Sequence, residues 1–140
     1  MANLHIDIVA AEGHIFSGEA VMVFAPAAMG EVGIAPRHAP LLTTLKPGAV
    51  RVQKADGTEL PFFVGGGILE VQPHLVTVLA DSAMRGEDAD EAAAAAAKQD
   101  AESKLAGATS QMDMAKAQAE LIEAAARLEF VKNLKTKTHG

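Results

Sequence analysis

The 140-residue sequence contains no cysteine, tryptophan or tyrosine, and it has only five phenylalanines. Without cysteine there is no disulfide, no thiolate metal ligand and no cysteine nucleophile. So few aromatic rings leave little on which bases or sugars could stack. The formal net charge of -6 provides no attraction to a phosphate backbone. We therefore expect no nucleic-acid partner.

Long apolar runs are also absent. No stretch approaches the roughly 18 consecutive apolar residues that a membrane span requires. The first residues, MANLHID, contain no basic leader followed by an apolar segment of secretory length. We therefore expect no direct membrane insertion, and any association with a membrane would depend on a protein partner.

Residues 1–86 have the pattern of short β-strands. Apolar and polar residues alternate along several segments, namely 5–10, 21–25 and 50–53. Alternation with a period of two is typical of strands with one buried face. Two hairpins are predicted, with turns at Asp56-Gly57 and at Pro73-His74. Closely spaced strands without intervening helices indicate an antiparallel β-sandwich or barrel.

The pattern changes after Gly86. Acidic residues open the next segment, where a helix N-terminus favours negative charge, and the unbroken alanine run 92–97 has high helix propensity. Gly107 is placed to end this helix, and a second helix is predicted to follow Thr109-Ser110. Two helices joined by a short loop form an antiparallel hairpin. The sequence thus predicts an α+β fold, with an N-terminal antiparallel β-sandwich (1–86) followed by a C-terminal two-helix hairpin (87–140).

The alanine-rich helix has two alternative interpretations. Its predicted inward face consists of Ala94, Ala97, Ala101 and Leu105. A buried methyl group contributes roughly 0.8 kcal/mol and a buried leucine about 1.5–3 kcal/mol, so this face docks weakly. The helix would remain helical when released, which suits a conformational switch. Alternatively, alanine simply allows the two helices to pack closely.

The sequence shows no pattern of catalytic or metal-binding residues. The five histidines, at positions 5, 14, 38, 74 and 139, include no pair at metal-ligand spacing. The serines lack a nucleophile-elbow context, and no acid–base pair of carboxylates can be identified. Gly65–Gly67 lacks the spacing and the lysine of a phosphate-binding loop and suits a bulge or a close backbone approach. A free-standing enzyme or carbohydrate module is therefore disfavoured, and we expect no catalytic residues and no metal.

Three segments resemble the signatures of one protein family. They are GEVGIAPRHAPLL (30–42), continued by LKPG (45–48), then FVGGGILEV (63–71) and VLAD (78–81). Their order and spacing, together with the terminal helix pair, resemble the epsilon subunits of bacterial F-type ATP synthases. The resemblance covers nearly the whole chain. It implies a non-catalytic rotor subunit of the central stalk that couples proton flow to ATP synthesis, with a flattened ten-stranded β-sandwich.

The first of these segments also has structural interpretations of its own. Gly30 and Gly33 would permit tight turns between strands, and Pro36 and Pro40 cannot donate to a sheet ladder. Three leucines could fill a core, namely Leu41, Leu42 and Leu45.

The resemblance further implies partners and a location. The β-sandwich would bind the gamma subunit and the ring of membrane c subunits, at the cytoplasmic face of the bacterial inner membrane. Glu31 would lie on the loop that faces the c-ring, and His38 would lie near the gamma interface. From the residues alone, the favoured interpretations are a solvated turn residue for Glu31 and a locally hydrogen-bonded histidine for His38.

The C-terminal hairpin of this family either folds against the sandwich or extends along gamma. When it is extended, its basic residues approach acidic loops of the catalytic beta and alpha subunits and hinder ATP hydrolysis. The matching candidates are Arg127, Lys132, Lys135 and Lys137. The alternative is that these residues only solubilise and cap a helix, and for Lys135 and Lys137 the two interpretations are equally supported.

Some family members bind ATP in the helix pair through Ile or Leu, Asp, two variable residues and Arg-Ala. The corresponding segment 89–94 keeps Asp90 but has alanine in place of the branched residue and of the arginine. Losing that guanidinium removes the group best suited to phosphate. Arg127 remains as a second candidate contact, but Glu123 stands where some ATP binders have arginine. These departures argue against ATP binding, so no cofactor is expected, and a nucleotide-sensing hairpin is the alternative hypothesis.

Overall fold

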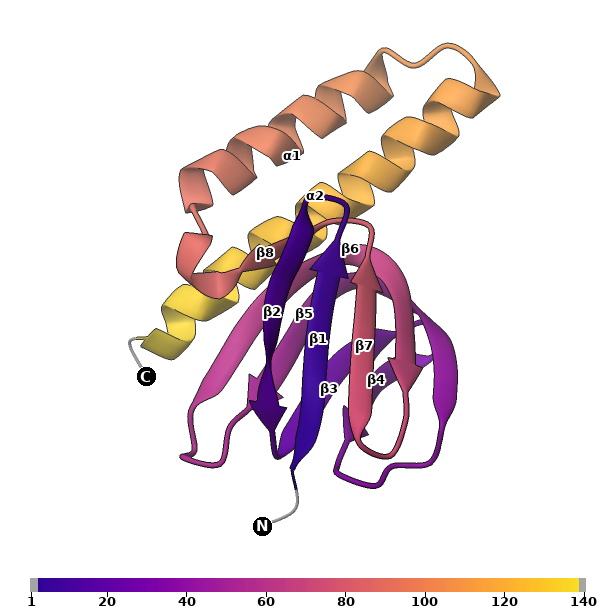
Figure 1. Cartoon of the computed structure of the whole chain (residues 1–140). Coiled ribbons are helices and arrows are strands. Elements are labelled where there is room, and N and C mark those ends of the chain that lie inside the picture. The colour runs from indigo at the N-terminus through magenta and orange to yellow at the C-terminus, as the bar shows by residue number, and fades with distance from the viewer. Residues whose placement is uncertain (1–2, 139–140) are drawn as a thin grey trace. The chain divides into compact units, whose positions relative to one another are not determined.

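The computed structural model describes residues 3–138, with side chains described up to Leu134. The chain divides into two compact units, Met1–Gly86 and Glu87–Gly140 (Figure 1). The described part of the first unit is built of strands, and a short 3₁₀ turn, η1 (Gly86–Asp88), leads into the helices of the second. The predicted α+β class, with strands followed by a helical hairpin, is confirmed.

The first unit consists of one sheet that curls over a hydrophobic core. Its strands are β1 (Leu4–Ala10), β2 (Gly13–Ala20), β3 (Met22–Ala27), β4 (Gly30–Ile34), β5 (Leu41–Gln53), β6 (Glu59–Val71), β7 (Leu75–Ala80) and β8 (Ala83–Arg85). The strand order is β2-β1-β7-β6-β5-β3-β4, and β8 also pairs with β6. Neighbouring strands are antiparallel except β1 and β7, which run parallel. A parallel pair needs a long connection, which β2 to β6 provide here.

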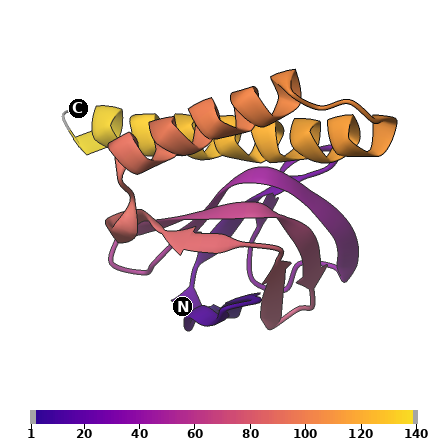
Figure 2. The ribbon, with the colours of Figure 1, turned by 90° about the horizontal axis from the view of Figure 1, so that it is seen from above.

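Eight strands are described, where the family resemblance implied ten. The difference arises from β5 and β6, which have 13 residues each and continue through a bend instead of breaking there (Figures 1 and 2). At the bend Leu45 pairs with Gly67 and Pro47 pairs with Gly65. Gly67 has φ +140, and a Cβ added to it would lie 2.8 Å from the Ala80 Cα. The glycine triplet is therefore a close backbone approach, as its sequence suggested.

The core follows the predicted alternation. The residues of β1 alternate between buried and half-buried, with Ile6 and Ile8 fully enclosed. Leu45 is buried, but Leu42 is 70% exposed, so the expectation that Leu42 fills the core was wrong. Leu41 and Leu42 are consecutive in a strand and point to opposite faces, so only Leu41 packs against the core.

Both predicted hairpins are present. The β5–β6 hairpin places Gln53 opposite Glu59, and the Thr58 N–H donates to the Asp56 carboxylate at 2.9 Å. The β6–β7 hairpin places Val71 opposite Val76. Strands β2 and β4 were not predicted, because edge strands lack a clear alternation and β4 contains two glycines. As a result Gly33 lies within β4, where it pairs with Phe24 instead of forming a turn.

The second unit consists of α1 (Glu91–Ala106) and α2 (Gln111–Thr138), which lie side by side (Figure 2). Asp90 is the N-cap of α1, and Ser110 Oγ accepts a 3.0 Å bond from the Asp113 N–H at the start of α2. The fully buried side chains of α1 are Ala94 and Ala101, both from its predicted inward face. The helices and their connection therefore match the predicted hairpin.

Candidate functional site

Glu31 lies on the edge strand β4, directly after an exposed turn. Met29 in that turn is 98% exposed, and Gly30 has φ +128, which favours glycine at this position. The Glu31 side chain is 55% exposed. Its carboxylate accepts hydrogen bonds from Arg51 Nη2 at 3.3 and 3.4 Å. Glu31 is thus exposed, but it lies in a strand and not on a loop or in a turn, so its expected placement was wrong. The Arg51 guanidinium holds its carboxylate, which the sequence did not reveal.

Arg51 connects four adjacent strands. It pairs with Phe24 in the β3–β5 register, and its guanidinium carbon lies 4.3 Å from the centre of the Phe24 ring. Arg51 Nη1 donates to Glu59 Oε2 at 3.3 Å, and Gln53 Nε2 donates to the same oxygen at 3.2 Å. Cation–π contact and a forked ion pair together suit arginine and not lysine.

His38 lies in the loop between β4 and β5. Its Nδ1–H donates to the Ala39 carbonyl at 2.7 Å. The preceding Arg37 has φ 67, which is uncommon outside glycine, and its N–H donates to the Pro73 carbonyl at 2.9 Å. The loop is therefore fixed to the β6–β7 turn, immediately before the start of β5 at Leu41.

An apolar stripe crosses the outward face of the sheet and consists of Val9, Leu42, Ile68 and Leu79. Ile68 pairs with Leu79, and Leu79 pairs with Val9. Leu42 lies diagonal to Ile68, because Ile68 pairs with Thr44 two residues farther along β5. Ile68 is 44% exposed and Leu79 is 49% exposed. Clustered exposed apolar side chains of this kind mark interaction surfaces.

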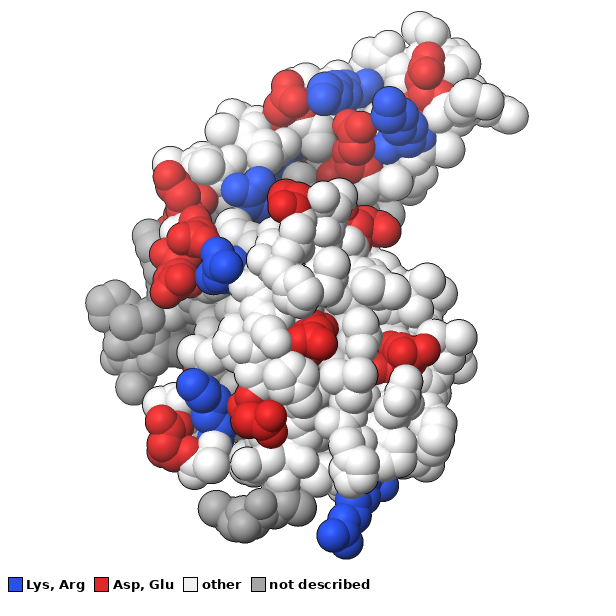
Figure 3. Space-filling model, in the orientation of Figure 1, with Lys and Arg blue, Asp and Glu red and all other residues white. Residues whose placement is uncertain are grey.

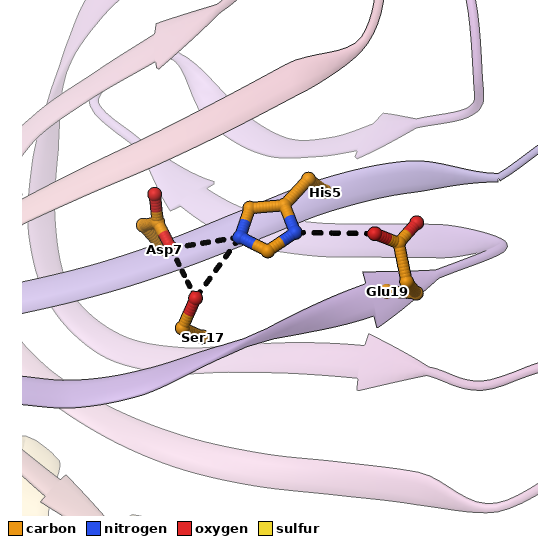
Figure 4. Close-up of polar contacts among 4 residues, drawn as sticks. All are labelled: His5, Asp7, Ser17 and Glu19. Atoms are coloured by element: carbon orange, nitrogen blue, oxygen red, sulfur yellow. Dashed lines mark hydrogen bonds and ion pairs between the residues drawn. The ribbon is translucent and has the colours of Figure 1, made fainter.

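Beside the stripe, on β1 and β2, four polar side chains form a cluster (Figure 4). Ser17 Oγ donates to Asp7 Oδ1 at 2.6 Å, and His5 Nε2 lies 3.0 Å from the same oxygen and 2.9 Å from Ser17 Oγ. His5 Nδ1 lies 3.2 Å from Glu19 Oε1. Since acceptors face both ring nitrogens, the cluster favours the imidazolium form of His5.

The same contacts shift two pKa values. The hydrogen bond to Glu19 raises the pKa of His5, and the bond to Asp7 acts in the same direction. The hydrogen bond from Ser17 lowers the pKa of Asp7, assisted by His5. Around this cluster the front face formed by β2, β1 and β7 carries few charged side chains (Figure 3).

We expect His5→Gln to destabilise the protein most at mildly acidic pH. Because the folded-state pKa of His5 is raised, its stabilisation is complete below the unfolded pKa of about 6.5 and is lost as pH rises through the folded value. Exposed, salt-screened pairs contribute about 0.2–1 kcal/mol. The difference in melting temperature between wild type and variant should therefore narrow between pH 5.5 and 8.5. His74→Gln, at an exposed turn, is the control, and a pH-independent difference would contradict the assignment.

In the helical unit, Asp90 has a local structural role. Its carboxylate accepts bonds from the N–H groups of Ala92 at 3.0 Å and Ala93 at 3.3 Å. These are two of the free N–H groups at the start of α1. The Asp90 carboxylate is therefore already engaged, and it is not among the residues that line the groove containing Arg127.

Arg127 lines a groove of about 220 Å³ between α1 and α2, and its Nε is buried without a hydrogen-bond partner. Lys104 Nζ lies 3.4 Å from Asp100 Oδ2 and 3.8 Å from Glu120 Oε2, so it links the two helices. Three carboxylates line the groove against two cations, namely Asp100, Glu120 and Glu123 against Lys104 and Arg127. This excess of negative charge disfavours a nucleotide.

The other proposed basic contacts lie farther along α2. Lys132 is exposed. The helix continues through Lys135 and Lys137, whose side chains lie outside the described residues. Within the described part of the chain, no group of three His, Asp or Glu residues could hold a metal ion. No helix there is long and apolar enough to cross a membrane.

An exposed apolar face on a β-sheet body is typical of proteins that interact with partners. Two family models match the two units. The β-sandwich domain of the ATP synthase delta/epsilon chain matches residues 3–86, and the long α-helix domain of the same chain matches residues 87–132.

Individual relatives agree with this match. The chain is 59% identical to the ATP synthase epsilon chain of Nitrosococcus oceani over 135 residues, which cover 96% of both chains. The chain therefore belongs to the ATP synthase epsilon-chain family. It is a subunit of an F-type ATP synthase and not an enzyme in its own right, as the sequence motifs predicted.

Two solved structures share the fold. A chain in the mitochondrial ATP synthase of Euglena gracilis has a TM-score of 0.76 at 18% identity, covering 90% of this chain and 79% of that one. A chain in the central stalk and c-ring structure from Tetrahymena thermophila has a TM-score of 0.62 at 14% identity, covering 93% and 95%. At these identities the similarity supports the fold alone.

Proposed function

We propose that this chain is a rotor subunit that couples proton flow to ATP synthesis, with the two tasks of linkage and braking separated between its two units. The sheet unit binds the gamma subunit and the c-ring. The helical hairpin restrains ATP hydrolysis at the catalytic beta and alpha subunits. The complex holds the chain at the cytoplasmic face of the bacterial inner membrane.

The assignment of the gamma interface to the sheet unit rests on the exposed apolar stripe. Its leucine and isoleucine side chains are exposed on adjacent strands, and protein interfaces typically have such an apolar centre with a polar rim. The position of His38 supports the same gamma assignment. Its loop is fixed to the β6–β7 turn, at the end of the sheet where Leu42 also lies. Met29 lies on the β3–β4 turn and Glu31 lies on β4 directly after it, and we assign these two residues to the c-ring contact.

The braking role is assigned to the basic residues of α2. Arg127 and Lys132 are the described candidates, and Lys135 and Lys137 extend the same helix. Opposite charges across an interface steer and orient association, so the basic C-terminal part of α2 suits acidic loops. ATP is not assigned to the hairpin, because Asp90 is engaged as a cap and the groove beside Arg127 is mainly acidic.

Retention by the gamma subunit tests the proposal. We expect immobilised gamma to retain the full chain in a pull-down, while the purified chain alone shows no ATP hydrolysis. An interface of standard size buries about 1,600 Å² and supports stable association. Failure of gamma to retain the folded chain would overturn the assignment.

A further inference from the structure

Arg51 contacts Glu31, Glu59 and the Phe24 ring, and it therefore links the exposed Glu31 to interior strands of the sheet. Its two terminal nitrogens contact different carboxylates, with Nη2 at Glu31 on β4 and Nη1 at Glu59 on β6. The Arg51 side chain is only 25% exposed, whereas that of Glu31 is 55% exposed. Arg51 is therefore the anchored member of the pair and Glu31 is the exposed one.

The first family segment contributes to this arrangement through a glycine. A Cβ added to Gly33 would lie 2.9 Å from Met22 Cε and 3.2 Å from Phe24 Cε1. Gly33 thus leaves room on the face of the sheet for the Phe24 ring. The Arg51 guanidinium lies over that ring and reaches across β3 to the edge strand. The space at Gly33 and the reach of Arg51 together determine where the Glu31 carboxylate lies.

We propose that Arg51 is a positioning residue for Glu31 in its contact with the c-ring, an inference that rests on the proposed function. A free glutamate side chain on an edge strand samples many rotamers, and binding must restrict them. The hydrogen bonds from the Arg51 guanidinium restrict the Glu31 rotamers before the c-ring binds. Because a lysine ammonium cannot reach both carboxylates in one plane, the positioning depends on the guanidinium and not on the charge alone.

The test is a double-mutant cycle on binding of the reconstituted gamma complex to the purified c-ring. We expect Glu31→Gln to weaken binding about tenfold and Arg51→Gln to weaken it roughly threefold. In the Glu31→Gln background, Arg51→Gln should have no further effect. Arg51→Lys should behave like Arg51→Gln, because it keeps the charge and loses the fork.

Glu12→Gln is the charge control, since it removes one exposed carboxylate at the β1–β2 turn, outside the contacts of Arg51. It should leave c-ring affinity unchanged, and thermal melting checks that each variant folds. If Glu31→Gln leaves affinity unchanged, the c-ring assignment of the proposed function fails. If Glu31→Gln weakens binding but Arg51→Gln has no effect, or an equal effect in both backgrounds, the positioning inference fails.

Discussion

Leu42→Lys weakens binding of the gamma subunit about a hundredfold, if the apolar stripe is the centre of the interface. Truncating a central apolar anchor typically costs 2 kcal/mol or more, and about 2.8 kcal/mol corresponds to a factor of one hundred. An unpaired charge in the desolvated centre adds to this loss. Titration of labelled gamma with the wild-type and variant chains measures the change.

Lysine is chosen because of the sheet register. Leu42 lies directly opposite Glu70, so the new ammonium faces a carboxylate and the cross-strand pair remains favourable for folding. Met112→Lys is the matched control, because Met112 is 81% exposed on α2, outside the stripe. Equal loss of affinity in both variants, or unchanged affinity in Leu42→Lys with an intact fold, would contradict the stripe as the gamma interface.

The sequence predicted the interior strands of the sheet but not its edges. Strand β1 lies between two neighbours with one face buried, so Ile6 and Ile8 alternate cleanly with His5 and Asp7. Strand β2 lies at the edge and alternates poorly. Since β2 was not recognised, the contacts of His5 with Ser17 and Glu19 could not be predicted from the sequence.

The candidate site was predictable only where a motif marks it. Glu31 and His38 came from the family resemblance, and their roles stay predictions. Arg51 was missed because its partner Glu31 is 20 positions away in the chain, and the two come together only because β3 pairs with both β4 and β5. The one available signal was a basic residue, Arg51, between the apolar Val50 and Val52. The apolar stripe was missed because Leu42 was assigned to the core.

Both interpretations of the alanine-rich helix, a releasable helix and close packing of two helices, are compatible with the structure. Because Ala94 and Ala101 are the fully buried side chains of α1, each offers roughly 0.8 kcal/mol of apolar burial, and Lys104 adds one exposed ion pair to α2. The contribution of α1 is small beside the core of the sheet unit, which encloses several isoleucines, leucines and valines. In the helical unit the large buried side chains belong to α2, namely Leu128, Phe130 and Val131. A weakly docked α1 can change its contacts while the sheet remains folded.

A chain ending at Arg85 should therefore fold, bind gamma and release the brake on ATP hydrolysis. The hydrophobic core lies wholly within residues 4–83, so removing the helices takes no buried side chain from it. Coupling between distant sites is typically about 1–3 kcal/mol, so hydrolysis in the reconstituted complex should rise at least about fivefold.

A full-length variant tests whether the charges of α2, and not only the presence of the helices, inhibit ATP hydrolysis. Arg127→Gln with Lys132→Gln removes the two described cations, and we expect it to recover part of the increase, less at high salt than at low salt. Unchanged hydrolysis in the truncated complex, with gamma still bound, would show that this hairpin is not a brake. An increase in the truncation alone would show that Arg127 and Lys132 are not the braking contacts, and the brake would then reside in Lys135, Lys137 or the uncharged surface of the helices.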